Sequence, residues 1–167
     1  MRKVTAARIA IIAVLTSAGV LAAHHSLIYT FDTTAPVWVK GTLVRLELVN
    51  PHSIMFLDQT GKDGKVQRWA VDGGPTPAQL DRRDIDADTV KVGDVIEVCG
   101  FVTKEGVSSQ RTFPPPGNQN IVSSAPSMSG RLMNGTLLVL TDGQTRVWSD
   151  YGGLQKCLEE EQSLRNK

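Results

Sequence analysis

Residues 37–49, with the sequence VWVKGTLVRLELV, decide the fold class of this chain. They are rich in β-branched and aromatic residues and alternate almost strictly between apolar and polar positions, which predicts a long β-strand. After Gly41 the apolar residues occupy even-numbered positions, from Val44 to Leu48, while Arg45 and Glu47 share the opposite face. Before Gly41 the apolar positions are odd-numbered. This change of parity predicts a bulge or bend at Gly41, the device by which small barrels turn their corners.

Further strand patterns follow at short spacing along the chain. Asn50-Pro51-His52 ends the first strand, because proline removes a hydrogen-bond donor and restricts the residue before it. The remaining predicted strands form two hairpins and one single strand. They are Ser53–Gln59 with Lys65–Val71, then Val95–Val102, then Gly135–Leu140 with Gln144–Trp148.

Two helices and one long loop complete the predicted elements. Thr76 before Pro77 fits an N-cap followed by proline at the first helical position, which predicts a short helix from Pro77 to about Arg83. Residues 112–130 are rich in Pro, Ser and Asn and predict a long loop. Residues 151–167 place Leu154, Cys157 and Leu158 at helical spacing, which predicts a C-terminal amphipathic helix.

This order of elements predicts a mainly β domain over residues 37–150, preceded by a lead-in over residues 24–36. Three strands, a short helix and then further strands follow the succession found in a small five-stranded Greek-key barrel of the OB type. A β-sandwich stays open as the alternative, because the order of strands does not fix how a sheet closes.

Residues 1–23 have the three-part pattern of a cleavable signal peptide. Arg2, Lys3 and Arg8 precede an apolar run, and small residues follow at Ala22 and Ala23. A retained membrane anchor is the alternative, but the 15 residues from position 9 to 23 are fewer than the roughly 20 that span a bilayer. We therefore expect export to the bacterial periplasm or beyond, with no stable membrane insertion after cleavage.

The charge of the processed chain limits its possible partners, and its cysteines predict a disulfide. Removal of the signal peptide leaves 15 basic against 17 acidic residues, a formal charge of −2 without a basic cluster, so nucleic acid is not an expected partner. Cys99 and Cys157 both remain after processing and would meet an oxidising compartment, which predicts a disulfide. Two free thiols are the alternative.

Several short motifs carry a family resemblance. They are Ala23-His24-His25-Ser26, Phe31-Asp32, Lys40–Val44, Val49–His52, the run from Gly64 to Trp69, and Val92–Val95. Together they resemble a family of small exported bacterial proteins that contain a domain of unknown function. The resemblance covers roughly residues 23 to 102 and implies export and one compact domain, but it implies no activity.

The three histidines are the chemically suggestive residues. His24 and His25 would stand at or next to the new N-terminus, where an α-amine and imidazoles can chelate Cu(II), and His52 can supply a third nitrogen. These residue types also suit Zn(II). The alternatives are that a free N-terminal His-His pair binds copper as any peptide would, and that His52 only caps a turn.

Enzymatic signatures do not occur in the sequence. There is no Gly-x-Ser-x-Gly elbow, no His-Glu-x-x-His motif and no phosphate-binding glycine loop. The aspartates at positions 81, 84, 86 and 88 lack the spacing of a calcium loop and predict a solvated loop. We therefore expect a non-enzymatic periplasmic binding module for a small ligand, a metal or an envelope protein. The alternative is a copper-binding redox protein that uses the N-terminal histidines.

Overall fold

The structure is a computed structural model that describes residues 27–105, 110–113 and 128–165. The chain divides into two compact units, Met1–Thr30 and Phe31–Lys167. The described part of the first unit is helix α2 (Leu27–Thr30). All other described elements belong to the second unit. In chain order they are β1 (Val37–Glu47), β2 (Ile54–Thr60), β3 (Val66–Asp72), α3 (Pro77–Asp81), β4 (Val95–Val102), β5 (Gln110–Phe113), β6 (Met128–Val139), β7 (Thr145–Val147) and α4 (Leu154–Arg165).

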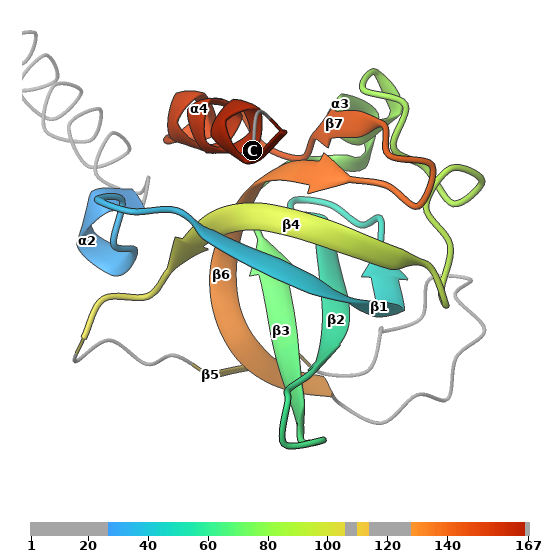
Figure 1. Cartoon of the computed structure of the whole chain (residues 1–167). Coiled ribbons are helices and arrows are strands. Elements are labelled where there is room, and N and C mark those ends of the chain that lie inside the picture. The colour runs from blue at the N-terminus through green and yellow to red at the C-terminus, as the bar shows by residue number, and fades with distance from the viewer. Residues whose placement is uncertain (1–26, 106–109, 114–127, 166–167) are drawn as a thin grey trace, which may run out of the picture. The chain divides into compact units, whose positions relative to one another are not determined.

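Five of these strands close into a barrel (Figure 1). β1 pairs antiparallel with both β2 and β4, β2 pairs with β3, and β6 pairs antiparallel with β4. The barrel closes where β3 and β6 run parallel, from Trp69 opposite Arg131 to Asp72 opposite Asn134. β5 and β7 extend the sheet beyond the barrel by pairing with β6. This arrangement confirms the OB-like Greek-key barrel, and its closure decides against a β-sandwich.

The change of parity in β1 is real, but its predicted position is wrong. The pairing of β1 with β2 shifts register between Leu43 and Arg45, so Val44 is the extra residue of a bulge. Gly41 lies in regular pairing and has a different role. A Cβ atom on Gly41 would lie 2.9 Å from the carbonyl oxygen of Asp58, so the close approach of β1 to β2 requires glycine there.

The predicted loop over residues 112–130 is wrong at both ends. Residues 112 and 113 belong to β5, and residues 128–130 belong to β6; residues 114–127 lie outside the described residues. Gly130 was the last residue of the predicted loop. In the structure it allows β6 to approach β3, because a Cβ atom there would lie 2.9 Å from the amide nitrogen of Ala70. β6 is therefore longer than the predicted strand, and β5 was not predicted at all.

The short helix α3 confirms the predicted cap. Thr76 accepts a hydrogen bond from the amide of Gln79 at 3.3 Å, and the Gln79 side chain accepts one from the amide of Thr76 at 2.8 Å. This reciprocal capping box, with Pro77 at the start, fixes where the helix begins. The helix ends at Asp81, slightly before the predicted Arg83.

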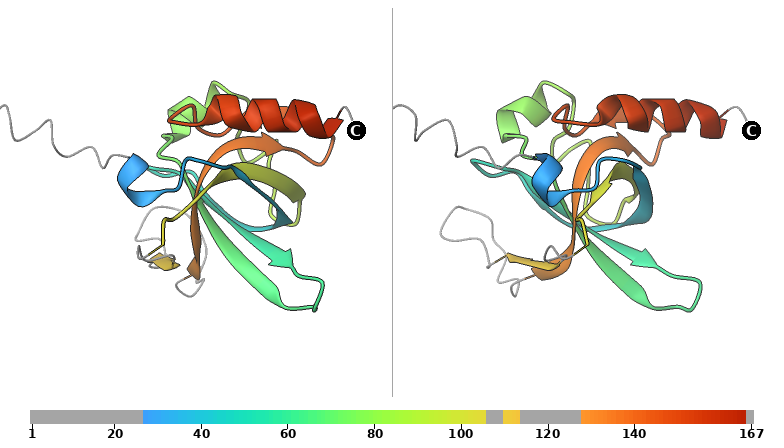
Figure 2. Two further views of the ribbon diagram at one scale, coloured as in Figure 1. Left: turned by 60° about the vertical axis from the view of Figure 1, so that its left-hand side comes forward. Right: turned by 90° about the vertical axis from the view of Figure 1, so that its left-hand side faces the viewer.

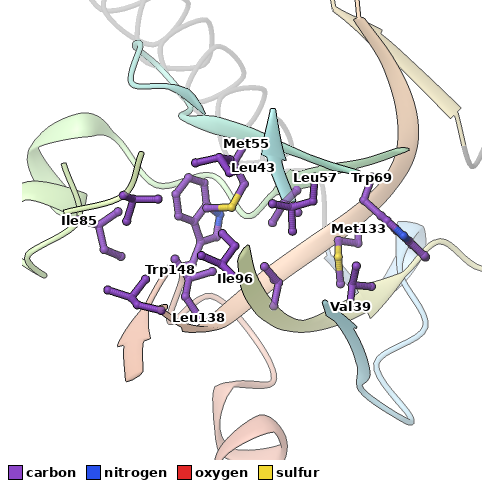
Figure 3. Close-up of a cluster of buried hydrophobic side chains, with 14 of the residues drawn as sticks. Val39, Leu43, Met55, Leu57, Trp69, Ile85, Ile96, Met133, Leu138 and Trp148 are labelled. Carbon is purple, nitrogen blue, oxygen red and sulfur yellow. The ribbon is translucent and has the colours of Figure 1, made fainter. Parts of the chain in front are cut away.

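Inward-facing side chains fill the barrel with apolar residues (Figure 3). Trp148 is fully buried among Met55, Ile96 and Leu138, at the end nearer Ile85. Trp69, Met133 and Val39 lie together on the other side of the cluster in Figure 3. The tryptophans at positions 69 and 148 are therefore core residues.

Helix α4 lies along the outside of the barrel and packs on β6 (Figure 2). A disulfide joins Cys99 in β4 to Cys157 in α4, as predicted, so neither cysteine is free. Both cysteines are fully buried with Leu137, while Leu154 and Leu158 pack against them. None of the helices in the described ranges is long and apolar enough to cross a membrane.

Candidate functional site

Of the three predicted metal ligands, only His52 lies in the described part of the chain. It is exposed in the connection between β1 and β2, and its ring faces Gly74, where a Cβ atom would lie 3.8 Å from the Nε2 atom. His24 and His25 lie outside the described residues, so their predicted site stays a prediction. Among the described residues, no three His, Cys, Asp or Glu side chains come together as a possible metal site.

The outer surface of strands β1 to β3 is a stronger candidate. OB barrels bind ligands on the corresponding surface, around their second and third strands. Side chains on a strand alternate between its two faces, and Met55, Leu57 and Val71 point into the core. The other parity therefore forms an outer surface, which we name the β1–β3 face. Its residues are Arg45, Glu47, Ile54, Phe56, Asp58, Arg68, Ala70 and Asp72.

The bulge in β1 places the two charged residues on this face. Arg45 lies opposite Phe56 and Glu47 lies opposite Ile54, both outward-facing residues of β2. Leu43 points into the core, so in a regular strand Arg45, two residues later, would also point inward. The bulge reverses the parity after Leu43 and turns Arg45 outward together with Glu47. The same reversal turns Leu46 toward the core.

Arg45 and Glu47 form a buried ion pair. Arg45 is 8% exposed and Glu47 is 9% exposed, which is unusual for charged residues. The Nη2 atom of Arg45 contacts the Oε1 atom of Glu47. The guanidinium carbon lies 5.9 Å from the centre of the Phe56 ring. The Nη1 atom of Arg45 is buried and has no hydrogen-bond acceptor among the described residues.

A second ion pair on the same face has a different geometry. Arg68 donates two hydrogen bonds to Asp58, from Nε to Oδ1 and from Nη2 to Oδ2, both at 2.7 Å. The hydrogen-bonded Asp58 carboxylate raises the pKa of the Arg68 guanidinium above its ordinary value, so the guanidinium stays charged. The side chains of this pair are more exposed, 36% for Arg68 and 21% for Asp58. The bidentate pair satisfies both groups at the edge of the face.

The sequence placed Arg45 and Glu47 together on one face of a strand, but it did not single them out as a site. Alternation gives the direction of a side chain relative to its neighbours and says nothing about what lies over it. A charged pair of this spacing on a strand normally indicates a solvated surface. The burial of the pair follows only from the complete fold.

A family model described as a family of unknown function, DUF6152, matches residues 11–112 of the chain. The chain belongs to the DUF6152 family. This match covers more than half of the chain and confirms the resemblance to a family with a domain of unknown function. The DUF6152 match includes strands β1 to β4, with Arg45, Glu47 and the three histidines, and ends before β6. No curated protein and no solved structure matches the chain.

Proposed function

We propose that this DUF6152 protein is an exported, non-enzymatic binding module that uses its β1–β3 face. The observation that carries the proposal is the Nη1 atom of the buried Arg45, which has no hydrogen-bond partner in the described part of the chain. Buried polar groups almost always have a hydrogen-bond partner, and an exception calls for an explanation. A ligand that supplies an acceptor to Nη1 is such an explanation.

The energetics of buried ion pairs support this proposal. Burying two charges costs several kcal/mol per ion, and apolar side chains of similar size often stabilise a protein as well or better. The Arg45–Glu47 pair lies beside Ile54 and Phe56, in surroundings that would suit such side chains. Stability alone therefore gives no reason for the pair, whereas recognition of a polar ligand does.

The charge and burial of the pair limit the kind of ligand. Glu47 already neutralises Arg45, so the remaining donor favours a small molecule with a neutral acceptor, such as a carbonyl or hydroxyl oxygen, over an anion. Because Nη1 is shielded from solvent in the free chain, binding includes a local opening of the side chains around it.

Export to the periplasm is part of the same proposal. The N-terminal pattern supports it, and so does the disulfide between Cys99 and Cys157, because disulfides persist mainly in oxidising compartments. The partner we expect there is a small ligand or an envelope protein.

Native mass spectrometry of untagged protein isolated from the bacterial envelope tests the proposal. We expect a small molecule bound to the wild-type protein, lost in Arg45→Met and retained in the matched control Arg68→Met. The denatured mass of the same sample gives the N-terminus and reports the loss of two hydrogens in a disulfide. The same bound species in Arg45→Met and wild type, or none in the wild type, would refute the binding role of this face.

Copper binding at the processed N-terminus is the second candidate. His52 is exposed, so its imidazole is accessible to a metal ion. Copper titration of processed wild-type protein, His24→Ala and His52→Ala distinguishes a folded site from simple peptide chelation. Equal affinity and stoichiometry in all three would exclude a folded site, and turnover of oxygen or peroxide by the copper form would favour a redox enzyme.

A further inference from the structure

A groove on another part of the barrel lies between the end of β1 and the connection from α3 to β4. It has a volume of about 380 Å³ and is lined by Leu46, Leu48, Ala87, Val90, Lys91 and Val92. We call it the Leu48–Val92 groove. Its volume is at the lower end of the range of small-molecule sites, so it can hold one or two side chains of a partner.

Backbone hydrogen bonds fix the two walls of the groove relative to each other. The amide of Gly93 donates to the carbonyl of Leu43 at 2.8 Å, and the amide of Leu43 donates to the carbonyl of Asp94 at 2.8 Å. The turn before β4 is thus joined to β1 as if it were part of the sheet. The groove is therefore present before any ligand binds.

The groove leaves apolar surface in contact with water. Val90 is 1% exposed, whereas Val92 is 66% exposed. Val95, which follows the same turn, is 43% exposed. Single exposed apolar residues are ordinary, whereas here five of the six residues that line one hollow are apolar, so a partner side chain could cover them together.

The chain segment that supplies Ala87, Val90, Lys91 and Val92 to the groove carries mostly negative charges, while Lys91 is the one charged residue in the lining itself. Asp86, Asp88 and Asp94 stand in the same nine-residue segment as Lys91, so carboxylates outnumber the single cation by three to one there. Asp86 accepts hydrogen bonds from the amides of Asp88 and Thr89, each at 2.8 Å. These bonds lower the pKa of Asp86, and its carboxylate stays charged.

We infer that the Leu48–Val92 groove binds a short basic and apolar peptide segment of a partner protein. An apolar side chain of the partner enters between Leu48 and Val92, and Lys or Arg residues on either side of it meet Asp86 and Asp88. The charge complementarity selects this occupant over an acidic amphiphile, which Lys91 alone would have to attract. The inference is independent of the role of the β1–β3 face.

NMR titration of the processed, 15N-labelled protein at low salt tests this inference. The probes are three blocked tripeptides with the sequences Lys-Leu-Lys, Gly-Leu-Gly and Glu-Leu-Glu. We expect the basic peptide to shift the amide signals of Val90, Lys91 and Val92 and to bind about tenfold more tightly than the acidic one, since each exposed ion pair contributes up to about 1 kcal/mol. Equal affinities of the three peptides, tighter binding of the acidic one, or no shift of these signals would overturn the inference.

Matched variants locate the binding. Val92→Ser removes an apolar wall and Asp88→Asn removes a charge, and we expect each to weaken the basic peptide about threefold to tenfold. Val66→Ser and Asp63→Asn are the controls, because Val66 is similarly exposed at 59% but lies with Asp63 at the β2–β3 hairpin. The amide spectrum of each variant reports that it is folded. Unchanged affinity in Val92→Ser and Asp88→Asn, or equal losses in the controls, would contradict the groove as the site.

Discussion

The outside of the barrel has two buried faces that are built in opposite ways. Under α4, the face around Cys99 and Leu137 is apolar and is closed by a disulfide. The buried hydroxyl of Thr136 lies 3.2 Å from the carbonyl of Cys99 and 3.0 Å from the Sγ atom of Cys157, both within hydrogen-bond distance. The β1–β3 face instead buries a charged pair, and Nη1 of Arg45 has no acceptor there within residues 27–105, 110–113 and 128–165.

The two faces differ in what their buried groups contribute to stability. A face that only stabilises the fold would use apolar side chains and satisfied polar groups, as the face under α4 does. The β1–β3 face keeps groups that cost free energy when they are buried. Local departures of this kind concentrate at functional sites, so the contrast favours a binding role for the β1–β3 face.

Removal of the disulfide should have the largest effect on stability. The bond closes a loop of 58 residues, which corresponds to about 4 kcal/mol in the chain-entropy model. We expect the double variant Cys99→Ser/Cys157→Ser to lose about this much free energy of unfolding in urea denaturation. Val66→Ser is the control and should leave the midpoint unchanged. A loss below about 1 kcal/mol would show that packing alone holds α4 on the barrel.

Breaking the buried pair should have the next largest effect. Glu47→Gln leaves a buried positive charge at Arg45, and we expect a loss of about 3 kcal/mol in the free energy of unfolding, measured in urea. The double variant Arg45→Met/Glu47→Leu removes both charges and should recover most of that loss. A double variant as unstable as the single one would mean that the pair stabilises the fold, and the contrast between the faces would lose its meaning.

The sequence predicted much of the barrel because local patterns determine its strands. Val95–Val102 was predicted with its observed boundaries, and the cap at Thr76 was correct because it depends on neighbouring residues only. β6 was predicted to begin only at Gly135, because the composition of residues 112–130 indicated a loop, and Gly130 has the same side chain in a loop and in a close strand contact. The parallel pairing that closes the barrel joins distant residues and leaves no local signal.

The candidate site was less accessible from sequence than the fold. The pattern of β1 predicted that Arg45 and Glu47 share one face. The bulge at Val44 decides that this face is the outer one. Whether such a pair is solvated or buried depends on the full tertiary structure. The histidines attracted attention by residue type, yet only His52 lies in the described part of the chain.

Breaking the second ion pair should have a small effect and so sharpen the contrast within the β1–β3 face. Arg68 is 36% exposed, and its hydrogen bonds with Asp58 compete with water. We expect Arg68→Met to lower the free energy of unfolding by about 0.5 kcal/mol in urea denaturation. Asp58→Asn should act similarly. A loss near that of Glu47→Gln would show that burial does not distinguish the two pairs.

The smallest effect is expected in the turn at Asp86, which belongs to neither face. The amides of Thr89 and Asp88 lower the pKa of Asp86 below its ordinary value of 3.8, so the folded state favours the charged form. This contribution is present above the unfolded pKa and is lost as the pH falls through the lower, folded pKa. Urea midpoints measured between about pH 5 and pH 2 should therefore fall less in Asp86→Asn than in the wild type, because the amide does not titrate. If both proteins show the same fall, the acid sensitivity arises elsewhere, and Asp32 or Asp63, whose pKa values are also lowered by hydrogen bonds, is the next carboxylate to replace.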